Sequence, residues 1–313
     1  SVQVEPTAPL TQSALLAHLR EMEEEDPLLS VRPEADGVSV GVMGAVQVEV
    51  LQGILAARFG DVVRMCPPHV LYKETIVAPV VGIGHYEPLR HYAEVWLKLE
   101  PGAPGSGISF AADCPPNSLE ENWQRLIRTH VFERAHPGVL TGSPLCDVRI
   151  RLIAGRAHLK HTEGGDFREA TCRAIRNALM QAENVLLEPV VRFELAMPNE
   201  ALARVTGELL RIGAQLDASE TDGGETTLTG RCTAAMFWDY PTRFAASTHG
   251  HGRIASRFDR YEPCKNQDDI VRQIGYDPLA DTLNPPGSVF CSHGAGFYVA
   301  WDHVREWAHC EVE

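Results

Sequence analysis

A short polar turn within a basic stretch has the residue types best suited to contact nucleic acid. Residues 148–176 contain only three acidic residues but seven basic ones: Arg149, Arg151, Arg156, Lys160, Arg168, Arg173 and Arg176. The most polar part, residues 158–166 (HLKHTEGGD), joins an alternating strand-like run to a helix-like segment. Histidines and a lysine on such a turn can contact phosphates or bases. The alternative is a solvated charged face without a ligand.

The C-terminal part of the chain contains residue types that bind zinc. Cys291 and His293 are two positions apart in a glycine-containing stretch (SVFCSHGAGF), and Cys310 lies further along. Cysteine and histidine are common zinc ligands, yet a C-x-H spacing is not that of a zinc finger or knuckle. We therefore expect a packed, tight turn and no bound metal. A zinc-binding hydrolase centred on Cys291, His293 and Cys310 is kept as a competing hypothesis.

Motifs for nucleotide hydrolysis or covalent catalysis are missing from the sequence. There is no G-x-x-x-x-G-K-[ST] loop to hold phosphates, no G-x-S-x-G nucleophile elbow and no H-E-x-x-H zinc motif. We therefore expect no catalytic residue in this chain.

The composition is that of a folded protein with an acidic balance. The 313 residues include 28 basic and 42 acidic side chains, which gives a net charge of −14, and 44% are hydrophobic. This balance argues against a general nucleic-acid coat and against DNA as a partner, although it permits a local basic face. The eight cysteines are scattered, and no apolar run is long enough to span a bilayer. We expect free buried thiols in a cytoplasmic protein without membrane contact.

Alternating and helical periodicities predict two small sandwiches around a middle segment. Residues 1–65 follow the order βαββαβ, and residues 190–261 repeat that order with little shared sequence. In the middle segment, residues 148–153 alternate like a strand, and residues 118–135 and 167–184 have helical spacing. About fifty further residues follow that neither sandwich requires. The sequence therefore predicts an α+β fold with two ferredoxin-like units.

Seven stretches, in order along the chain, resemble the last three domains of elongation factor G and, more closely, of the tetracycline-resistance ribosomal protection proteins. They span residues 1–263, about five sixths of the chain, and their colinearity makes the resemblance specific. The stretches are SVQVEP at Ser1, EDPLLSV at Glu25, GVMGAVQVEV at Gly41, VLYKETI at Val70, PGVLTGSPLCDVRIRL at Pro137, NVLLEPVVRFELAMP at Asn184 and STHGHGRIASRFDRYEP at Ser247.

The resemblance implies a domain plan in which the middle segment is the arm that reaches the decoding site. In that plan the fourth domain is a ribosomal-protein-S5-like α+β unit between two ferredoxin-like βαββαβ sandwiches. GTP and Mg belong to an N-terminal domain outside this chain, so we expect neither cofactors nor GTP hydrolysis here. The implied boundaries are residues 1–68 for the third domain, 69–188 for the fourth, 189–262 for the fifth and 263–313 for a C-terminal extension.

The resemblance also implies which residues meet the ribosome. In the family, the tip of the fourth domain lies in the decoding region, and an edge of the fifth domain faces ribosomal RNA near the GTPase centre. Flat rings would stack on bases, and Lys160 and Arg156 would meet phosphates. The implied tip is Gly84, His85, Tyr86, Arg156, His158, Leu159, Lys160, His161, Thr162, Glu163, Gly164, Gly165 and Asp166. The implied second edge is Thr248, His249, His251 and Arg253.

Two stretches of the sequence favour one branch of the family, whereas the turn of residues 158–166 does not match that branch. EDPLL and GAVQVEV favour the protection proteins, whose implied task is to displace tetracycline from the ribosome and restore tRNA entry. The turn matches neither the His-x-Val-Asp-Ser tip common in translocases nor the Ser-Pro-Val tip typical of protection proteins. An elongation-factor-G-like GTPase with another ribosomal role is therefore an alternative. A protein-interaction module that binds through its acidic surface is another.

Overall fold

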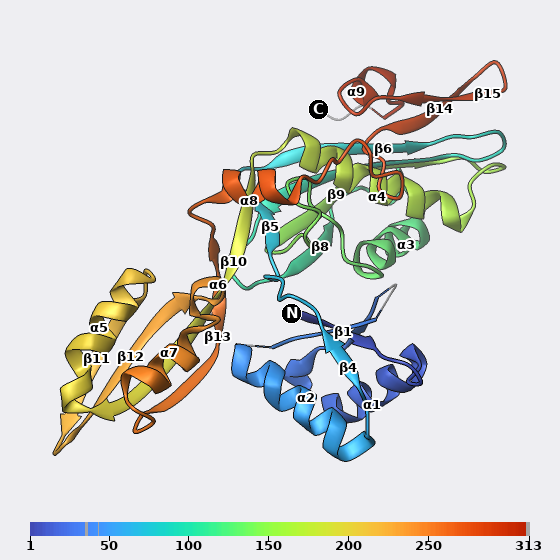
Figure 1. The fold of residues 1–313 in the computed structure, drawn as a ribbon. Coiled ribbons are helices and arrows are strands. Elements are labelled where there is room, and N and C mark those ends of the chain that lie inside the picture. Colours follow the sequence, from blue (N-terminus) through green and yellow to red (C-terminus); the bar gives the residue numbers. More distant parts are fainter. Residues whose placement is uncertain (35–36, 43, 311–313) are drawn as a thin grey trace. The chain divides into compact units, whose positions relative to one another are not determined.

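The computed structural model describes residues 1–34, 37–42 and 44–310. Met43 of the GVMGAVQVEV stretch lies outside the described residues. The chain forms two compact units, each assembled from segments that are distant in sequence (Figure 1). Unit 1 consists of Ser1–Leu71 with Glu188–Glu262, and unit 2 of Tyr72–Leu187 with Pro263–Glu313.

The N-terminal segment of unit 1 is a four-stranded antiparallel sheet with the strand order β2-β3-β1-β4. Its core contains Val4, Leu15, Leu19 and Leu55, all without measurable exposure. The second strand of the predicted βαββαβ order is only two residues long, and a 3₁₀ turn at Pro27–Leu29 precedes it. The elements are β1 (Val2–Pro6), α1 (Gln12–Glu25), η1 (Pro27–Leu29), β2 (Arg32–Pro33), β3 (Val38–Val40), α2 (Ala45–Phe59) and β4 (Val63–Met65).

The second segment of unit 1 repeats the βαββαβ order, as the periodicity predicts, with the strand order β11-β12-β10-β13. The predicted single helix at residues 234–247 is two helices, α6 and α7. Pro241 lies in the first turn of α7, a position where a missing N–H does no harm. The elements are β10 (Asn184–Pro198), η2 (Asn199–Ala201), α5 (Leu202–Arg211), β11 (Gln215–Asp222), β12 (Glu225–Thr233), α6 (Ala234–Phe237), α7 (Tyr240–Ser247) and β13 (Arg253–Pro263).

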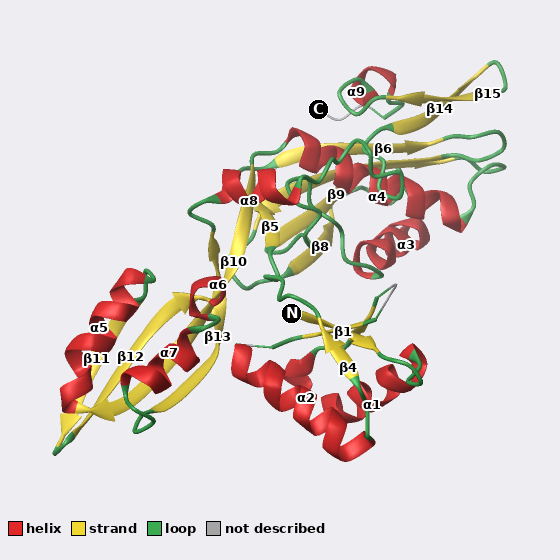
Figure 2. Cartoon of the chain, in the orientation of Figure 1, coloured by secondary structure: helices red, strands yellow, loops and turns green. Residues whose placement is uncertain are grey.

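Unit 2 contains a six-stranded mixed sheet with helices α3 and α4 (Figure 2). Helix α4 packs closely on β6 because Gly82 and Gly84 carry no side chain. A Cβ on Gly84 would lie 1.8 Å from the carbonyl oxygen of Ala170. The elements are β5 (Lys73–Ile76), β6 (Val80–Tyr86), β7 (Ala93–Pro101), β8 (Ile108–Ala112), α3 (Glu121–Phe132), β9 (Val148–Ala157), α4 (Gly164–Gln181), α8 (Gln267–Ile274), β14 (Ser288–Ser292), β15 (Ala295–Val299) and α9 (Val304–Trp307).

The C-terminal segment, expected as an extension of its own, is part of the unit 2 sheet. Strand β14 pairs in parallel with β6, and β15 forms the sheet edge. Three side chains of α4 attach the segment: Arg173 donates to the carbonyl of Gly287, Asn177 to that of Trp301, and Arg176 to the hydroxyl of Tyr276. The predicted α+β class is confirmed. Within the described ranges, every helix is too short or too polar to cross a bilayer.

Candidate functional site

The turn of residues 158–163 is held in one conformation by hydrogen bonds to itself and to the connection between β6 and β7. The Thr162 hydroxyl donates to the carbonyl oxygen of Tyr92 at 2.6 Å and accepts from the backbone N–H of His158 at 2.7 Å. The backbone N–H groups of His161 and Thr162 both donate to the carbonyl of His158. Two connections that are distant in sequence therefore form one end of unit 2 (Figure 1).

The turn presents stacked rings, an apolar apex and a cation to solvent. The rings of His158 and His161 stack with centroids 4.6 Å apart and an angle of 25° between their planes. Leu159 is fully exposed, with a relative accessibility of 101%, and Lys160 is exposed beside it. Such a surface can stack on a base, contact it through apolar atoms and meet a phosphate. Sequence reasoning included Leu159 without a role, because periodicity does not reveal an exposed apex.

Four of the seven basic residues in the stretch bind other groups of the protein, so the stretch does not form one solvated basic face. Arg151 pairs with Asp113, and Arg168 pairs with Glu133. Arg173 and Arg176 are buried and bind backbone carbonyls. Among the basic residues near the turn, Arg156 and Lys160 are exposed and their side chains form no hydrogen bond or ion pair with the described residues. The cationic part of the candidate site is therefore small.

Three of the implied tip residues are buried and cannot contact a base or a phosphate of the ribosome directly. Gly84 and His85 lie inside the unit on β6, so the stacking role inferred for His85 is wrong. Asp166 is 2% exposed and caps α4 by accepting the backbone N–H of Glu163 at 2.8 Å. It also accepts from His91 Nδ1 at 2.8 Å. Sequence reasoning missed this positioning role of His91, because the two residues are 75 positions apart.

The remaining implied tip residues lie at or near the same end of the unit. Tyr86 is half-buried at the end of β6, and Glu163 takes part in the capping box that starts α4. Gly164 and Gly165 are the exposed first residues of that helix. They carry the chain from the turn into α4.

Replacement of Asp166 by alanine should loosen the turn at a modest cost in stability. The change removes the capping bond and the contact with His91, and loss of a helix cap costs about 0.5–2 kcal/mol. Urea unfolding should show that loss, and proteolysis should cleave residues 158–163 faster than in the wild type. Glu169→Ala is the matched control on the same helix, because the Glu169 side chain is 46% exposed and Arg173 keeps its hydrogen bond to the carbonyl of Gly287 without it. Equal behaviour of the two variants would contradict the capping role.

Beneath the turn, Glu94 is a fully buried carboxylate that accepts four hydrogen bonds. The donors are His85 Nδ1, the Trp96 indole and the backbone N–H groups of His309 and Cys310, each at 2.8 Å. Burial alone would raise the pKa of Glu94, but these hydrogen bonds together lower it to about 2. The charged carboxylate therefore joins the C-terminal segment to β6 and β7.

The implied second edge is only partly exposed. Thr248 is 2% exposed, and its hydroxyl donates to the carbonyl of Phe244, so the contact role inferred for it is wrong. His249 is exposed in the left-handed region with a φ of 52°, and His251 is exposed after it. Arg253 is exposed and pairs with Glu225. Three of the four implied residues are therefore accessible.

The structure does not assemble the proposed zinc ligands of the C-terminal segment. Cys291 lies within β14, and His293 lies at the exposed hairpin turn with a φ of 51°. Burial, with Glu94 beside it, raises the pKa of the Cys310 thiol to about 12. In the described part of the chain, none of the three belongs to a cluster of three or more metal-ligating side chains. The zinc-hydrolase hypothesis centred on them is therefore wrong.

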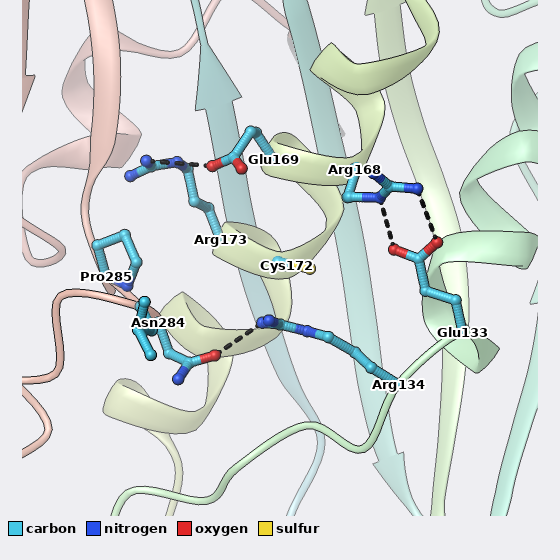
Figure 3. A pocket seen from close by; sticks show the side chains of 9 residues that line it. Glu133, Arg134, Arg168, Glu169, Cys172, Arg173, Asn284 and Pro285 are labelled. Carbon is cyan, nitrogen blue, oxygen red and sulfur yellow. Dashed lines mark hydrogen bonds and ion pairs between the residues drawn. The ribbon is translucent and has the colours of Figure 1, made fainter. Parts of the chain in front are cut away.

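A small pocket between α4 and the C-terminal segment is lined by side chains that bind one another (Figure 3). Arg168 binds Glu133, Arg173 binds Glu169, and Arg134 donates to Asn284. The pocket contains none of the implied tip residues. We therefore assign it a structural role.

Two family models match consecutive parts of the chain. Residues 68–183 match elongation factor G, domain IV, and residues 185–270 match the elongation factor G C-terminus. The turn of residues 158–163 lies within the first match, and the edge at residues 248–253 lies within the second.

A solved structure has the same fold over most of this chain. A crystal structure of a protein from Thermus thermophilus matches with a TM-score of 0.71 and 24% sequence identity. The match covers 88% of this chain but only 42% of that one. The chain belongs to the elongation factor G family, of which it carries domain IV and the C-terminal domain.

Proposed function

We propose that this chain is the ribosome-binding portion of a translation-factor GTPase and that residues 158–163 enter the decoding region. The observation that carries the proposal is the turn itself, which protrudes from the domain IV unit with stacked rings and a fully exposed leucine. The hydrogen bond from Thr162 to Tyr92 and those within the turn fix it before binding, so little conformational entropy is lost on contact.

The chemistry of contact differs between the side chains of the turn. His158 and His161 supply flat faces for stacking on exposed bases, worth about 1–3 kcal/mol per base. Leu159 offers an apolar contact, and Lys160 with Arg156 meets phosphates in a salt-dependent way. Because the whole chain has a net charge of −14, this contact has to be local.

The finer assignment is to the tetracycline-resistance ribosomal protection type, acting in the cytoplasm. The tip would compete with the drug at its site, and His249, His251 and Arg253 would contact ribosomal RNA near the GTPase centre. GTP and Mg would be bound by an N-terminal domain that this chain does not contain. EDPLL and GAVQVEV, which resemble the protection branch, support this assignment.

The double variant Lys160→Ala with His161→Ala should weaken ribosome binding without affecting folding. Lys160 is exposed, and among the described residues the His161 ring stacks only on the exposed His158, outside the hydrophobic core, so the melting temperature should stay within about 1 °C. The loss of one phosphate contact and one stacking surface should weaken binding by about tenfold or more. Sedimentation with ribosomes at several salt concentrations measures this. Arg272→Ala, which removes an exposed cation on α8, is the matched control. Equal binding by all three proteins would contradict the proposed tip.

The finer assignment is tested in cells with the gene restored to full length. Expression in a tetracycline-sensitive strain should raise the growth-inhibiting drug concentration, and replacement of residues 158–163 by glycine and serine should abolish that rise. If a well-expressed, ribosome-binding protein gave no rise, the elongation-factor-G-like alternative with another ribosomal role would be favoured.

A further inference from the structure

Two histidines and a glutamate from distant parts of unit 2 meet beneath the turn. His85 ends the buried part of β6, Glu87 follows that strand, and His309 comes from the C-terminal segment. One possible ligand atom of each lies within 4.8 Å of the others. His85 is fully buried, Glu87 is half-buried and His309 is exposed. The group is therefore closed toward the protein interior and accessible to solvent at His309.

The ring orientations are set by partners outside this group. His85 Nδ1 faces Glu94 Oε2 at 2.8 Å, and His309 Nδ1 faces the Tyr92 hydroxyl at 3.0 Å. The Nε2 of His85 points to Glu87 Oε2 at 3.1 Å, and the Nε2 of His309 is left available. Metal-binding histidines commonly have their other ring nitrogen held by a carboxylate or another polar group. Glu94 and Tyr92 are positioned for that role.

We propose that His85, Glu87 and His309 form a site for a zinc-like divalent transition-metal ion. Two imidazoles and one carboxylate are a ligand set that zinc accepts, with a further position open to water. Mg²⁺ prefers oxygen ligands only and is a poor fit. Zinc binds the neutral imidazole and the ionised carboxylate, so any proton on the ligand atoms leaves to solvent when the ion binds.

The geometry requires only a small movement to close around the ion. Zinc bonds of about 2.0–2.1 Å in a tetrahedral arrangement place ligand atoms about 3.3 Å apart, somewhat closer than in this structure. His309 can supply that movement, because it lies on the exposed side of the group near the end of the described chain.

A metal at this position would join the C-terminal segment to β6 and to the start of the β6–β7 connection, which also holds the turn through Tyr92. The His309 ring stacks with Tyr92 at a centroid distance of 5.8 Å, and Tyr92 lies 6.3 Å from the ring of His158. The site is thus connected to the turn through one aromatic side chain. Its ligands are separate from the exposed residues of the turn, so metal binding does not depend on the proposed ribosomal function.

The test is metal binding by the full chain in the absence of ribosomes. After removal of metal with a chelator, the protein is dialysed against micromolar Zn²⁺, and bound metal is measured by elemental mass spectrometry. We expect about one Zn²⁺ per chain, retained in excess Mg²⁺. Co²⁺ should give the visible absorption bands of a tetrahedral site. Less than a tenth of an equivalent of zinc would overturn the proposal.

Variants decide whether the named residues hold the ion. His309→Ala and Glu87→Gln should each weaken Zn²⁺ binding by more than about 100-fold, and Tyr92→Phe by about 10–100-fold. His303→Ala is the matched control, because it removes an exposed histidine of the same segment that pairs with Glu306. Melting of each metal-free variant verifies folding. Wild-type affinity in His309→Ala, or an equal loss in His303→Ala, would overturn the site.

Discussion

Replacement of Glu94 by alanine is expected to detach the C-terminal segment from unit 2 and to lower the free energy of unfolding by about 3–5 kcal/mol. The change leaves four donors without their acceptor in a buried site: the His85 ring, the Trp96 indole and the backbone N–H groups of His309 and Cys310. Each unsatisfied buried group carries a desolvation cost. Urea unfolding measures the loss, and hydrogen exchange of residues 300–310 measures the detachment.

The matched control is Glu100→Ala on the same strand. Glu100 pairs with Lys98 and Arg151 near the surface, and exposed pairs of this kind contribute about 1 kcal/mol or less. It removes the same side chain and charge without stranding buried donors. If Glu94→Ala lost no more stability than this control, or if exchange in residues 300–310 were unchanged, the carboxylate would not hold the segment.

Periodicity predicts what is local in this fold. Both βαββαβ units, β9 and α4 follow from alternating or helical spacing of apolar residues, because each element buries one face on its own sheet. Their ends were less predictable: α4 was expected to begin at residue 167 but begins at Gly164. The reason is the capping box of Glu163 and Asp166, whose carboxylates satisfy backbone groups that hydrophobicity does not register.

Contacts between distant residues account for what the sequence did not predict. The family resemblance placed His85 and Asp166 at the ribosome-facing tip, yet each is buried against a charged or polar partner from another element. The C-terminal segment looked separable because neither predicted sandwich requires it. Its strand β14 pairs with β6, more than 200 positions away. Such pairings depend on the folded sheet and leave no local spacing pattern.

The turn and the C-terminal segment are linked through the same two strands. Strand β7 carries Glu94, which binds the C-terminal segment, and the connection between β6 and β7 holds the turn through Tyr92. A rigid turn loses less conformational entropy when it binds a partner than a flexible one does. The C-terminal segment adds two strands to the sheet on which that rigidity depends.

Gly84→Ala should disrupt the packing of α4 and thereby displace the turn. The added methyl group would lie 1.8 Å from the carbonyl oxygen of Ala170 and 2.5 Å from the backbone nitrogen of Ala174. Both are backbone atoms of a helix, which cannot yield by a change of rotamer, so α4 has to shift as a body. Overpacking of this kind costs about 1–3 kcal/mol and occasionally more, and this contact belongs to the upper end. Urea unfolding measures the cost.

The consequence for function follows from where α4 begins. The helix starts at Gly164, directly after the turn, so its displacement should weaken ribosome binding by the full chain as well as stability. Gly165→Ala on the same helix is the matched control, because its Cβ meets nothing within 4 Å. That variant should be as stable as the wild type or gain about 0.4–1 kcal/mol, with ribosome binding retained. Equal stability of the two variants would show that α4 is not held against β6 at Gly84.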